Sequence, residues 1–462
     1  MNGCFQSMNP SPVDKIANAV LYEGYILYPY RASSRKNRQR FTFGRIYPQA
    51  YSEAQNGAEP FAMQTECLLR RRCEMPTVQV RVRFLHPMAR AIGLLSAPVP
   101  ELPANLEPGD LSLVPELRIG DRLYQTWQET VEREVQSSQP LPDNLVAQTV
   151  SLPFHFSSSL AFDPIHDCQN QVVGAIIRRQ QSLEGTIKIG VQTVDREVFK
   201  ISVTVANHTP VSECDLNQQE EVLLRTFAST HTILELDRGE FLSLLDPPEA
   251  YAEVTATCLN IGTWPVLVGE EEKGEAGAML SSPIILYDYP QIAPESPGEF
   301  FDGTEIDEIL ALRVLTMTDQ EKWEMSQVDE HARQILTRTE ALPKEEFWKM
   351  HGTIRGNRFS SEDFFDPNTR LESVSVNGTD LKVGHHVRIR PQGRADVIDL
   401  ALEGKIALIE SIEQDAENRV YLALVLEEDP GKDLGMLRQP GHRFFYGSNE
   451  VEPLTGTDEQ TK

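Results

Sequence analysis

The alternation of apolar and polar residues between positions 183 and 207 constrains the fold of this chain more than any other feature. Apolar residues occupy every second position in two arms, and a polar turn at 195–197 separates the arms. The alternating positions are Ile187, Ile189 and Val191 before the turn, and Phe199, Ile201, Val203 and Val205 after it. A period of two is typical of strands with one buried face, so we predict an antiparallel hairpin.

Two further segments of the first half favour β-structure. Residues 18–50 carry aromatic residues on two arms, and we predict a hairpin with an elaborated loop. In residues 78–84, valines and Phe84 alternate with Gln79, Arg81 and Arg83, which predicts a strand with one wet, basic face. We therefore expect residues 15–210 to form a mostly-β, sandwich-like domain.

The pattern changes after Pro210, where helix-start signals become frequent. The short apolar run 283–287 predicts a buried strand, and a connector with three prolines follows it. Asp302-Gly-Thr-Glu305 and Thr318-Asp-Gln-Glu321 both place a carboxylate three residues after a capping side chain, as helix starts do. We expect residues 211–352 to form a central α-rich α/β region.

The last quarter of the chain returns to short β-segments. Residues 353–380 are polar and read as a linker. Glycines and prolines then punctuate five short segments within residues 381–454, which predicts a small SH3-like β-barrel. The segments are 386–390, 405–412, 419–426, 443–446 and 450–453. The predicted fold class is α+β and multidomain.

Composition excludes several classes of protein. The formal net charge is −26, which argues against nucleic acid as a partner because phosphate binding needs a basic surface. No apolar run approaches the roughly 18 residues of a membrane helix, so we expect no membrane insertion. The six cysteines form no CxxC pair, which predicts neither a metal site nor a disulfide framework. We predict a cytoplasmic protein with reduced thiols and no cofactor.

A basic cluster stands out against this acidic background. Six Lys and Arg residues lie from Arg31 to Arg45, with no acid between Glu23 and Glu53. One interpretation is a solvated loop. The other is a contact with an acidic protein or anion, because clustered arginines beside aromatic residues suit bidentate recognition. The predicted partner-binding residues are Arg35, Lys36, Arg38, Arg40, Phe41, Phe43, Tyr287, Asp288 and Tyr289.

A run of carboxylates between positions 295 and 308 is the best candidate for chemistry. Carboxylates at this density could hold a hard cation or act as a general acid and base. Acidic residues in the first turn of a helix are also stabilised by the helix dipole, which gives a structural interpretation. The possible carboxylate site comprises Glu295, Asp302, Glu305 and Asp307. We assign no catalytic residue and predict no bound metal, because no nucleotide-binding, nucleophile or zinc motif occurs.

Several longer strings give the chain a family resemblance. They are Lys36-Asn-Arg-Gln-Arg40 with Phe41-Thr-Phe-Gly44, Ser281-Ser-Pro-Ile-Ile-Leu-Tyr-Asp-Tyr289, Glu295-Ser-Pro-Gly298, Thr304-Glu-Ile-Asp-Glu-Ile-Leu310 and Asp429-Pro-Gly431 followed by Leu434-Gly435. They resemble a bacterial family whose genes lie beside those of [NiFe] hydrogenases. The resemblance implies an accessory role in building or serving a hydrogenase.

The expected function is therefore a non-catalytic accessory, assembly or scaffold protein that acts through protein–protein binding. The resemblance implies that its partner is a hydrogenase subunit or maturation factor. Two alternatives remain open at this point. One is an enzyme that uses the 295–308 carboxylates on a small substrate. The other is a permanent structural subunit of the finished complex.

Overall fold

The computed structural model describes residues 11–343, 371–391, 402–414, 420–429 and 443–454, with short gaps at 33, 35–36, 38–39, 42, 73–75, 142–146, 271–273, 293–297, 299, 302–306 and 377. The chain divides into two compact units. The first is Met1–Ile292 with Phe301–Gly303 and Gln327–Asp329, and the second is Ala293–Phe300, Thr304–Ser326 and Glu330–Lys462.

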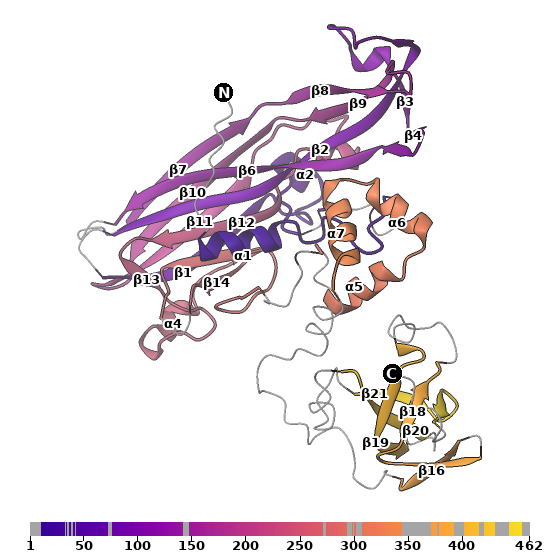
Figure 1. The fold of residues 1–462 in the computed structure, drawn as a ribbon. Helices are drawn as coiled ribbons and strands as arrows, with labels where there is room; N and C mark the ends of the chain where they lie inside the picture. Colours follow the sequence, from indigo (N-terminus) through magenta and orange to yellow (C-terminus); the bar gives the residue numbers. More distant parts are fainter. Residues whose placement is uncertain are drawn as a thin grey trace. The chain divides into compact units, whose positions relative to one another are not determined.

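The first unit is organised around β2 (Thr77–Val99), a strand of 23 residues. Its first part pairs with β6 and β12, and its second part pairs with β3 and β9, all antiparallel. The resulting eight-stranded sheet contains β14 (Trp264–Val268), β15 (Ala278–Ser282), β12 (Ala228–Leu236), β2, β9 (Val172–Gln180) and β8 (Ser159–His166), with β3 (Ser112–Val114) and β6 (Trp127–Pro140) alongside β2. The long strands run side by side in Figure 1.

A second, five-stranded antiparallel sheet packs against the first. Its order is β13 (Gly239–Phe241), β1 (Ala62–Arg71), β11 (Val198–Asn207), β10 (Leu183–Thr193) and β7 (Ala147–Phe156). The hairpin predicted at 183–207 is confirmed as β10 and β11, with Ile189 opposite Val203. The Asp195 carboxylate closes the turn by accepting backbone N–H groups from Glu197 and Val198. Apolar residues at every second position determine this register, because a shift of one residue would turn all of them to the other face of the sheet.

One apolar core lies between the two sheets. It draws alternate residues from both, including Val80 and Phe84 of β2 and Ile201 and Val203 of β11. The Phe84 and Phe227 rings lie 4.7 Å apart within it. The alternation predicted for 78–84 is confirmed, and the first half of the chain is β-rich as expected. A small two-stranded ribbon, β4 (Glu116–Ile119) and β5 (Arg122–Gln125), and a 3₁₀ turn, η2 (Pro108–Asp110), lie in the β3–β6 region.

The basic face of β2 is covered, contrary to the prediction that it is wet. Helix α1 (Pro12–Leu21) starts at Ser11, whose side chain accepts from the Asp14 backbone N–H. Its apolar side packs on β12, β14 and β15. Figure 1 draws the α1 ribbon next to the strands of this sheet. Asp14 lies 2.8 Å from Arg81 and 3.3 Å from Arg83, so the arginines of β2 pair with an acid of the covering helix.

Residues 18–50 do not form the predicted hairpin. The described residues there contain the end of α1, irregular turns and the start of α2 (Gln49–Ala54), with a single β-bridge at Ile46. The Asn37 side chain takes the place of a strand partner, since its amide accepts from the Leu27 N–H and donates to the Leu27 carbonyl. Several aromatic residues of this segment, among them Tyr25, Tyr30 and Phe41, are buried without lying in a strand, although their spacing resembles that of strands.

The prediction of a central α-rich region is wrong. Strands β12, β14 and β15 complete the eight-stranded sheet, and β13 joins the other sheet, so residues 228–282 belong to the sandwich. The helical pieces there are short: α3 (Gln219–Leu223), η3 (Glu249–Tyr251) and α4 (Ala252–Thr255). The buried strand predicted at 283–287 is not found. Strand β15 ends at Ser282, one residue before the predicted segment begins, because Pro283 has no N–H to donate to a neighbouring strand. Ile285, within the predicted segment, is 68% exposed.

Three longer helices follow the sandwich in sequence and pack on one another. They are α5 (Asp307–Leu315), α6 (Asp319–Ser326) and α7 (Glu330–Glu340). The capping box predicted at Thr318 is present. The Thr318 hydroxyl accepts from the Glu321 N–H, and the Glu321 carboxylate accepts from the Thr318 N–H. The helical segment that begins at this box consists of two helices, α6 and α7, with a break between residues 326 and 330.

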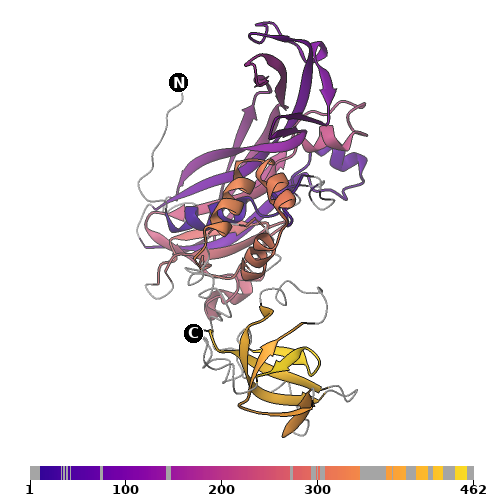
Figure 2. The same ribbon diagram turned by 45° about the vertical axis from the view of Figure 1, so that its right-hand side comes forward.

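The C-terminal segment contains the predicted strands but no closed barrel among its described residues. A hairpin of β16 (Ser373–Val376) and β17 (Thr379–Lys382) comes first. A five-stranded antiparallel sheet follows in the order β21 (Phe444–Gly447), β20 (Val420–Leu426), β19 (Ile406–Gln414), β18 (His386–Ile389) and β22 (Val451–Pro453). The edge strands β21 and β22 do not pair with each other, so this sheet, seen in Figure 2, stays open.

Candidate functional site

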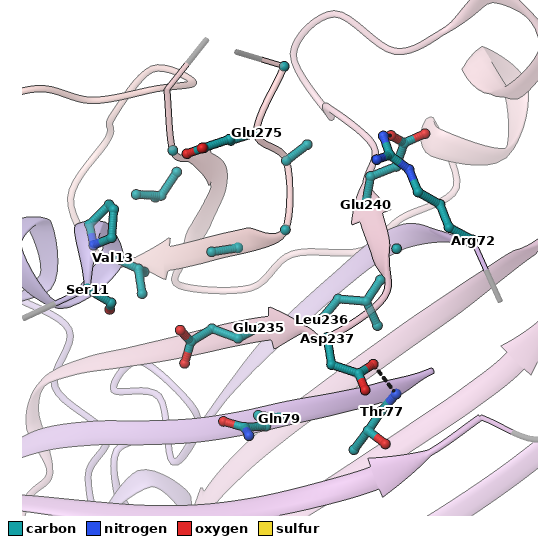
Figure 3. Close-up of a pocket in the computed structure, with 18 residues that line it drawn as sticks. Ser11, Val13, Arg72, Thr77, Gln79, Glu235, Leu236, Asp237, Glu240 and Glu275 are labelled. Carbon is teal, nitrogen blue, oxygen red and sulfur yellow. Dashed lines mark hydrogen bonds and ion pairs between the residues drawn. The ribbon is translucent and has the colours of Figure 1, made fainter. Parts of the chain in front are cut away.

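A groove of about 820 Å³ opens beside strands β2, β12 and β13 of the sandwich. It lies among the N-terminus of α1, the start of β2, the β12–β13 turn and the connection between β14 and β15 (Figure 3). Its apolar lining includes Val13, Leu236 and Val268, all of which are buried in the core. Four carboxylates also line it, and they come from Glu235, Asp237, Glu240 and Glu275. We call this the acidic groove.

The acidic groove is shaped by a tight approach of backbone to backbone. Gly269 follows β14 with φ +154°, and a Cβ at this position would lie 2.5 Å from the carbonyl oxygen of Glu275. A side chain would therefore push the two arms of the β14–β15 connection apart. The glycine at position 269 thus allows the two arms to approach each other, and Glu275 lies at the edge of the groove, as Figure 3 shows.

Arginines and backbone N–H groups hold the carboxylates of the acidic groove. Glu235 lies 2.8 Å from Arg81, and Glu240 pairs with Arg70 and Arg72. The Asp237 carboxylate accepts a 2.7 Å hydrogen bond from the Thr77 N–H, drawn as a dashed line in Figure 3. This bond is the largest cause of a lowered pKa for Asp237, and the nearby Arg238 acts in the same direction. Three of the four carboxylates, those of Glu235, Asp237 and Glu240, are therefore fixed in place.

The acidic groove combines carboxylates with an apolar floor. Within the described ranges, no group of three or more His, Cys, Asp or Glu side chains could hold a metal ion. The described lining residues include neither histidine nor cysteine. Fixed carboxylates above an apolar floor can instead bind a chain that carries both cationic and apolar side chains.

The predicted basic loop lies partly outside the described residues, which leave out Arg35, Lys36 and Arg38. Arg40 is described, and it is only 3% exposed. Its guanidinium stacks on the Trp127 ring and donates from Nη1 to the Gln128 carbonyl. Burial lowers the pKa of Arg40 to about 10, against the attraction of Tyr25 and Asp329. Arg40 is therefore an interior residue of this loop.

Aromatic side chains complete the surroundings of Arg40. The Tyr25 hydroxyl donates to Asp329, and the Trp127 indole donates to the same carboxylate at 3.4 Å. Phe41 is also buried, with its ring 5.4 Å from that of Tyr25. Phe43 is half-buried and lines a separate pocket. The assignment of these residues to a partner surface stays a prediction.

The three predicted residues after β15 have different environments. Tyr287 is 81% exposed. The Asp288 carboxylate accepts from the Ser243 hydroxyl and, at 2.7 Å, from the Leu267 N–H. The Tyr289 N–H donates to the Leu267 carbonyl at 2.8 Å. Asp288 and Tyr289 therefore cover the free edge of β14, which would otherwise expose unpaired backbone groups.

The predicted carboxylate site is mostly outside the described residues. Glu295, Asp302 and Glu305 fall in the gaps, so the structure does not test whether they converge. Asp307 is the first residue of α5 and is half-buried. An acid in this first turn interacts favourably with the helix dipole.

Sequence reasoning did not assign the acidic groove. The signal available was two acidic turns, Glu235-Leu-Asp-Arg-Gly-Glu240 and the Glu-rich stretch at 270–275. Taken alone, each of these two turns is typical of an ordinary solvated turn. Only the pairing of β12 with β2 and β15 brings the two turns together.

Comparison with known proteins adds no relative. No protein-family model matches the chain, and no curated protein matches it. A search of the described helices for one that could cross a bilayer found none of sufficient length and apolarity.

Proposed function

We propose that this chain is a non-catalytic accessory protein that binds a basic, partly apolar segment of a protein partner in the acidic groove. The observation that carries the proposal is the combination of four carboxylates, three of them fixed by their partners, with an apolar floor in one groove of about 820 Å³. Extended chains with alternating basic and apolar residues match this pattern. The fixed geometry of the carboxylates lowers the entropy lost on binding.

Charge supports the same assignment of partner. The whole chain carries a net charge of −26, so a basic partner is attracted at long range. Among the described residues that line the groove, Arg72 is the single basic one, and it is already paired with Glu240. Glu235 and Asp237 are also paired, with Arg81 and Arg238, so it is the net negative charge of the whole chain that accelerates association with a basic partner and excludes nucleic acids.

The resemblance of several sequence strings to a family encoded beside hydrogenase genes is what suggests the system. On this basis the partner is a subunit or maturation factor of a [NiFe] hydrogenase. A transient assembly role and permanent membership of the complex both fit the groove. A cytoplasmic location is part of the proposal, and the four described cysteines, all unpaired, agree with a reducing compartment.

Site-specific cross-linking tests the proposal. A tagged chain with a photoreactive residue at Gln79, an exposed residue that lines the groove, should cross-link to the co-purifying partner in native host cells. The same residue at Gln136, which is exposed on β6 and outside the groove, is the matched control. Capture of no protein, or equal cross-linking at both positions, would remove the groove as the binding site.

A further inference from the structure

Strand β7 is the last strand in the order of the five-stranded sheet, so one of its two edges has no neighbouring strand. Its register with β10 runs without a shift, from Leu183 opposite Phe156 to Gln192 opposite Ala147. Within the described part of the chain, no other backbone segment forms a hydrogen bond with the backbone of β7. An uncovered edge of this kind is a template on which a further strand can pair.

The contacts of Glu184 in β10 determine which backbone groups of β7 point to the open edge. The Glu184 carbonyl accepts from the His208 N–H at 2.9 Å, and the Glu184 N–H donates to the Thr209 hydroxyl at 3.0 Å. Both backbone groups of Glu184 therefore point away from β7, where His155 is its facing residue. In such an antiparallel pair the facing residue also turns its groups away, so the His155 N–H and C=O point to the open edge. By alternation, residues 147, 149, 151 and 153 do the same.

Small side chains leave the outward-pointing backbone groups accessible over part of β7. Ala147, Thr149 and Ser151 are all exposed, and none of them is bulky enough to shield its own N–H and C=O. Pro153 is the next outward-pointing residue, and it has no N–H to donate. Leu152, on the other face of the strand, packs against the core. The docking site is therefore the stretch 147–151, which we call the β7 edge.

The charge of the β7 edge favours a second copy of this chain as its occupant. Residues 147–156 contain no Asp, Glu, Lys or Arg, although 24% of the chain is charged. The adjoining strand β10 contributes one charge of each sign, from Glu184 and Lys188. Two copies that each carry a net charge of −26 repel each other least where the contact surface is neutral. A basic segment would find no carboxylate on β7 to face it.

We propose that two copies of this chain pair through their β7 edges, antiparallel and centred on Thr149. In this register Thr149 faces Thr149 of the second copy, and Ala147 faces Ser151. Each of these facing pairs exchanges two backbone hydrogen bonds, and threonine opposite threonine is a favourable cross-strand pair. A register centred on Ser151 is poorer, because it places Pro153, without an N–H, opposite Thr149. The inference goes beyond the proposed function, because the β7 edge shares no residue with the acidic groove.

Sedimentation velocity of the full chain at several concentrations tests the pairing. A contact between two strand edges is small, so we expect monomer at about 1 μM and dimer at about 100 μM. Thr149→Lys places two like charges face to face and should weaken the dimer at least about tenfold, as should Thr149→Glu. An equimolar mixture of these two variants should recover the dimer, because lysine then faces glutamate. Ser138→Lys, at an exposed serine of β6, is the matched control and should leave the dimer unchanged.

Three results would overturn the inference. The first is a parent chain that stays monomeric at the highest concentration, and the second is a dimer that Thr149→Lys leaves intact. The third is a mixture of the lysine and glutamate variants that is no more dimeric than either alone, because position 149 would then not face itself. A monomeric chain whose Thr149→Lys variant loses the co-purifying partner would show that the β7 edge takes a strand of that partner instead. Each result can occur with the Gln79 cross-link intact, so failure here is distinguishable from failure of the proposed function.

Discussion

Ser282 Oγ lies 3.2 Å from Nε2 of His231 in the interior of the eight-stranded sheet. The other ring nitrogen, Nδ1, lies 2.7 Å from the Ser229 carbonyl, which can only accept a hydrogen bond. Nδ1 therefore carries the proton, and Nε2 accepts from the serine hydroxyl. Both side chains are fully buried, so this pair cannot reach a substrate. It joins β12 to the end of β15 as a structural hydrogen bond.

Acid should destabilise the sandwich through its buried histidines. Burial, with Arg83 nearby, lowers the pKa of His231 to about 4, and burial beside Arg133 lowers that of His86 to about 3. Below pH 6.5 the unfolded chain protonates these rings and the folded chain does not, so stability is lost as the pH falls. Between pH 8 and pH 5 the expected loss is about 2 kcal/mol for each histidine.

Urea unfolding at the two pH values measures this loss. His231→Gln should reduce the difference between pH 8 and pH 5, because glutamine has no ring to protonate. His208→Gln, at an exposed position, is the control and should leave the difference unchanged. A His231→Gln protein with the full pH dependence would contradict the assignment to this residue.

Gly44→Ala should destabilise the first unit strongly. The new methyl group would meet Pro283 at 2.6 Å, and φ +54° is strained for any residue with a Cβ. The expected loss is about 3 kcal/mol in the free energy of unfolding. Gly57→Ala separates the two causes, because Gly57 has φ +76° and open space around its Cβ position. That variant should lose only about 1 kcal/mol; equal losses in urea unfolding would show that the contact with Pro283 is unimportant.

The sequence predicts those parts of the fold that short-range patterns determine. Alternation in β10, β11 and β2 reports a buried face directly, because neighbouring side chains of a strand point to opposite sides. The capping box at Thr318 is similarly local. Local patterns do not determine the placement of β12, β14 and β15, since it depends on partners up to 158 residues away along the chain, as for Leu236 opposite Val78.

The errors have physical causes of the same kind. The aromatic spacing in 18–50 resembles a strand, but Asn37 supplies the hydrogen bonds that a neighbouring strand would give to Leu27. Arg81 and Arg83 look solvent-exposed until α1 brings Asp14 over them. The acidic groove needs two turns that only the tertiary fold brings together. A single sequence carries no local record of these contacts.

Arg40→Met should lower stability, because the guanidinium fills a site that its neighbours are arranged to receive. The variant loses the stacking on Trp127 and the hydrogen bond to the Gln128 carbonyl, with an expected loss of about 3 kcal/mol. Arg40→Lys should recover little of it, since an ammonium lacks the planar fork. Arg238→Met, at an exposed arginine paired with its own neighbour, should change stability by at most about 0.5 kcal/mol. Stability of Arg40→Met equal to that of the parent in urea would place the side chain outside the core.

A metal assay separates the enzyme alternative from a binding protein. If the 295–308 carboxylates are structural, purified protein should contain no stoichiometric divalent ion after dialysis. Glu305→Gln with Asp307→Asn should then leave the metal content unchanged in elemental analysis. A retained ion that this double variant loses would favour the enzyme.

The C-terminal segment should fold alone, but its boundary matters. Val376 and Leu381 of the β16–β17 hairpin are buried in the core of the five-stranded sheet, and the Leu371 N–H donates to the Ile412 carbonyl at 2.9 Å. A fragment of residues 371–454 should therefore melt cooperatively and show dispersed NMR signals. A fragment of 381–454 lacks β16 and should be less stable by about 2 kcal/mol, roughly the value of one buried valine side chain. Equal stability of the two fragments would show that the hairpin is not part of this core, and a disordered spectrum for both would mean that the segment depends on the rest of the chain.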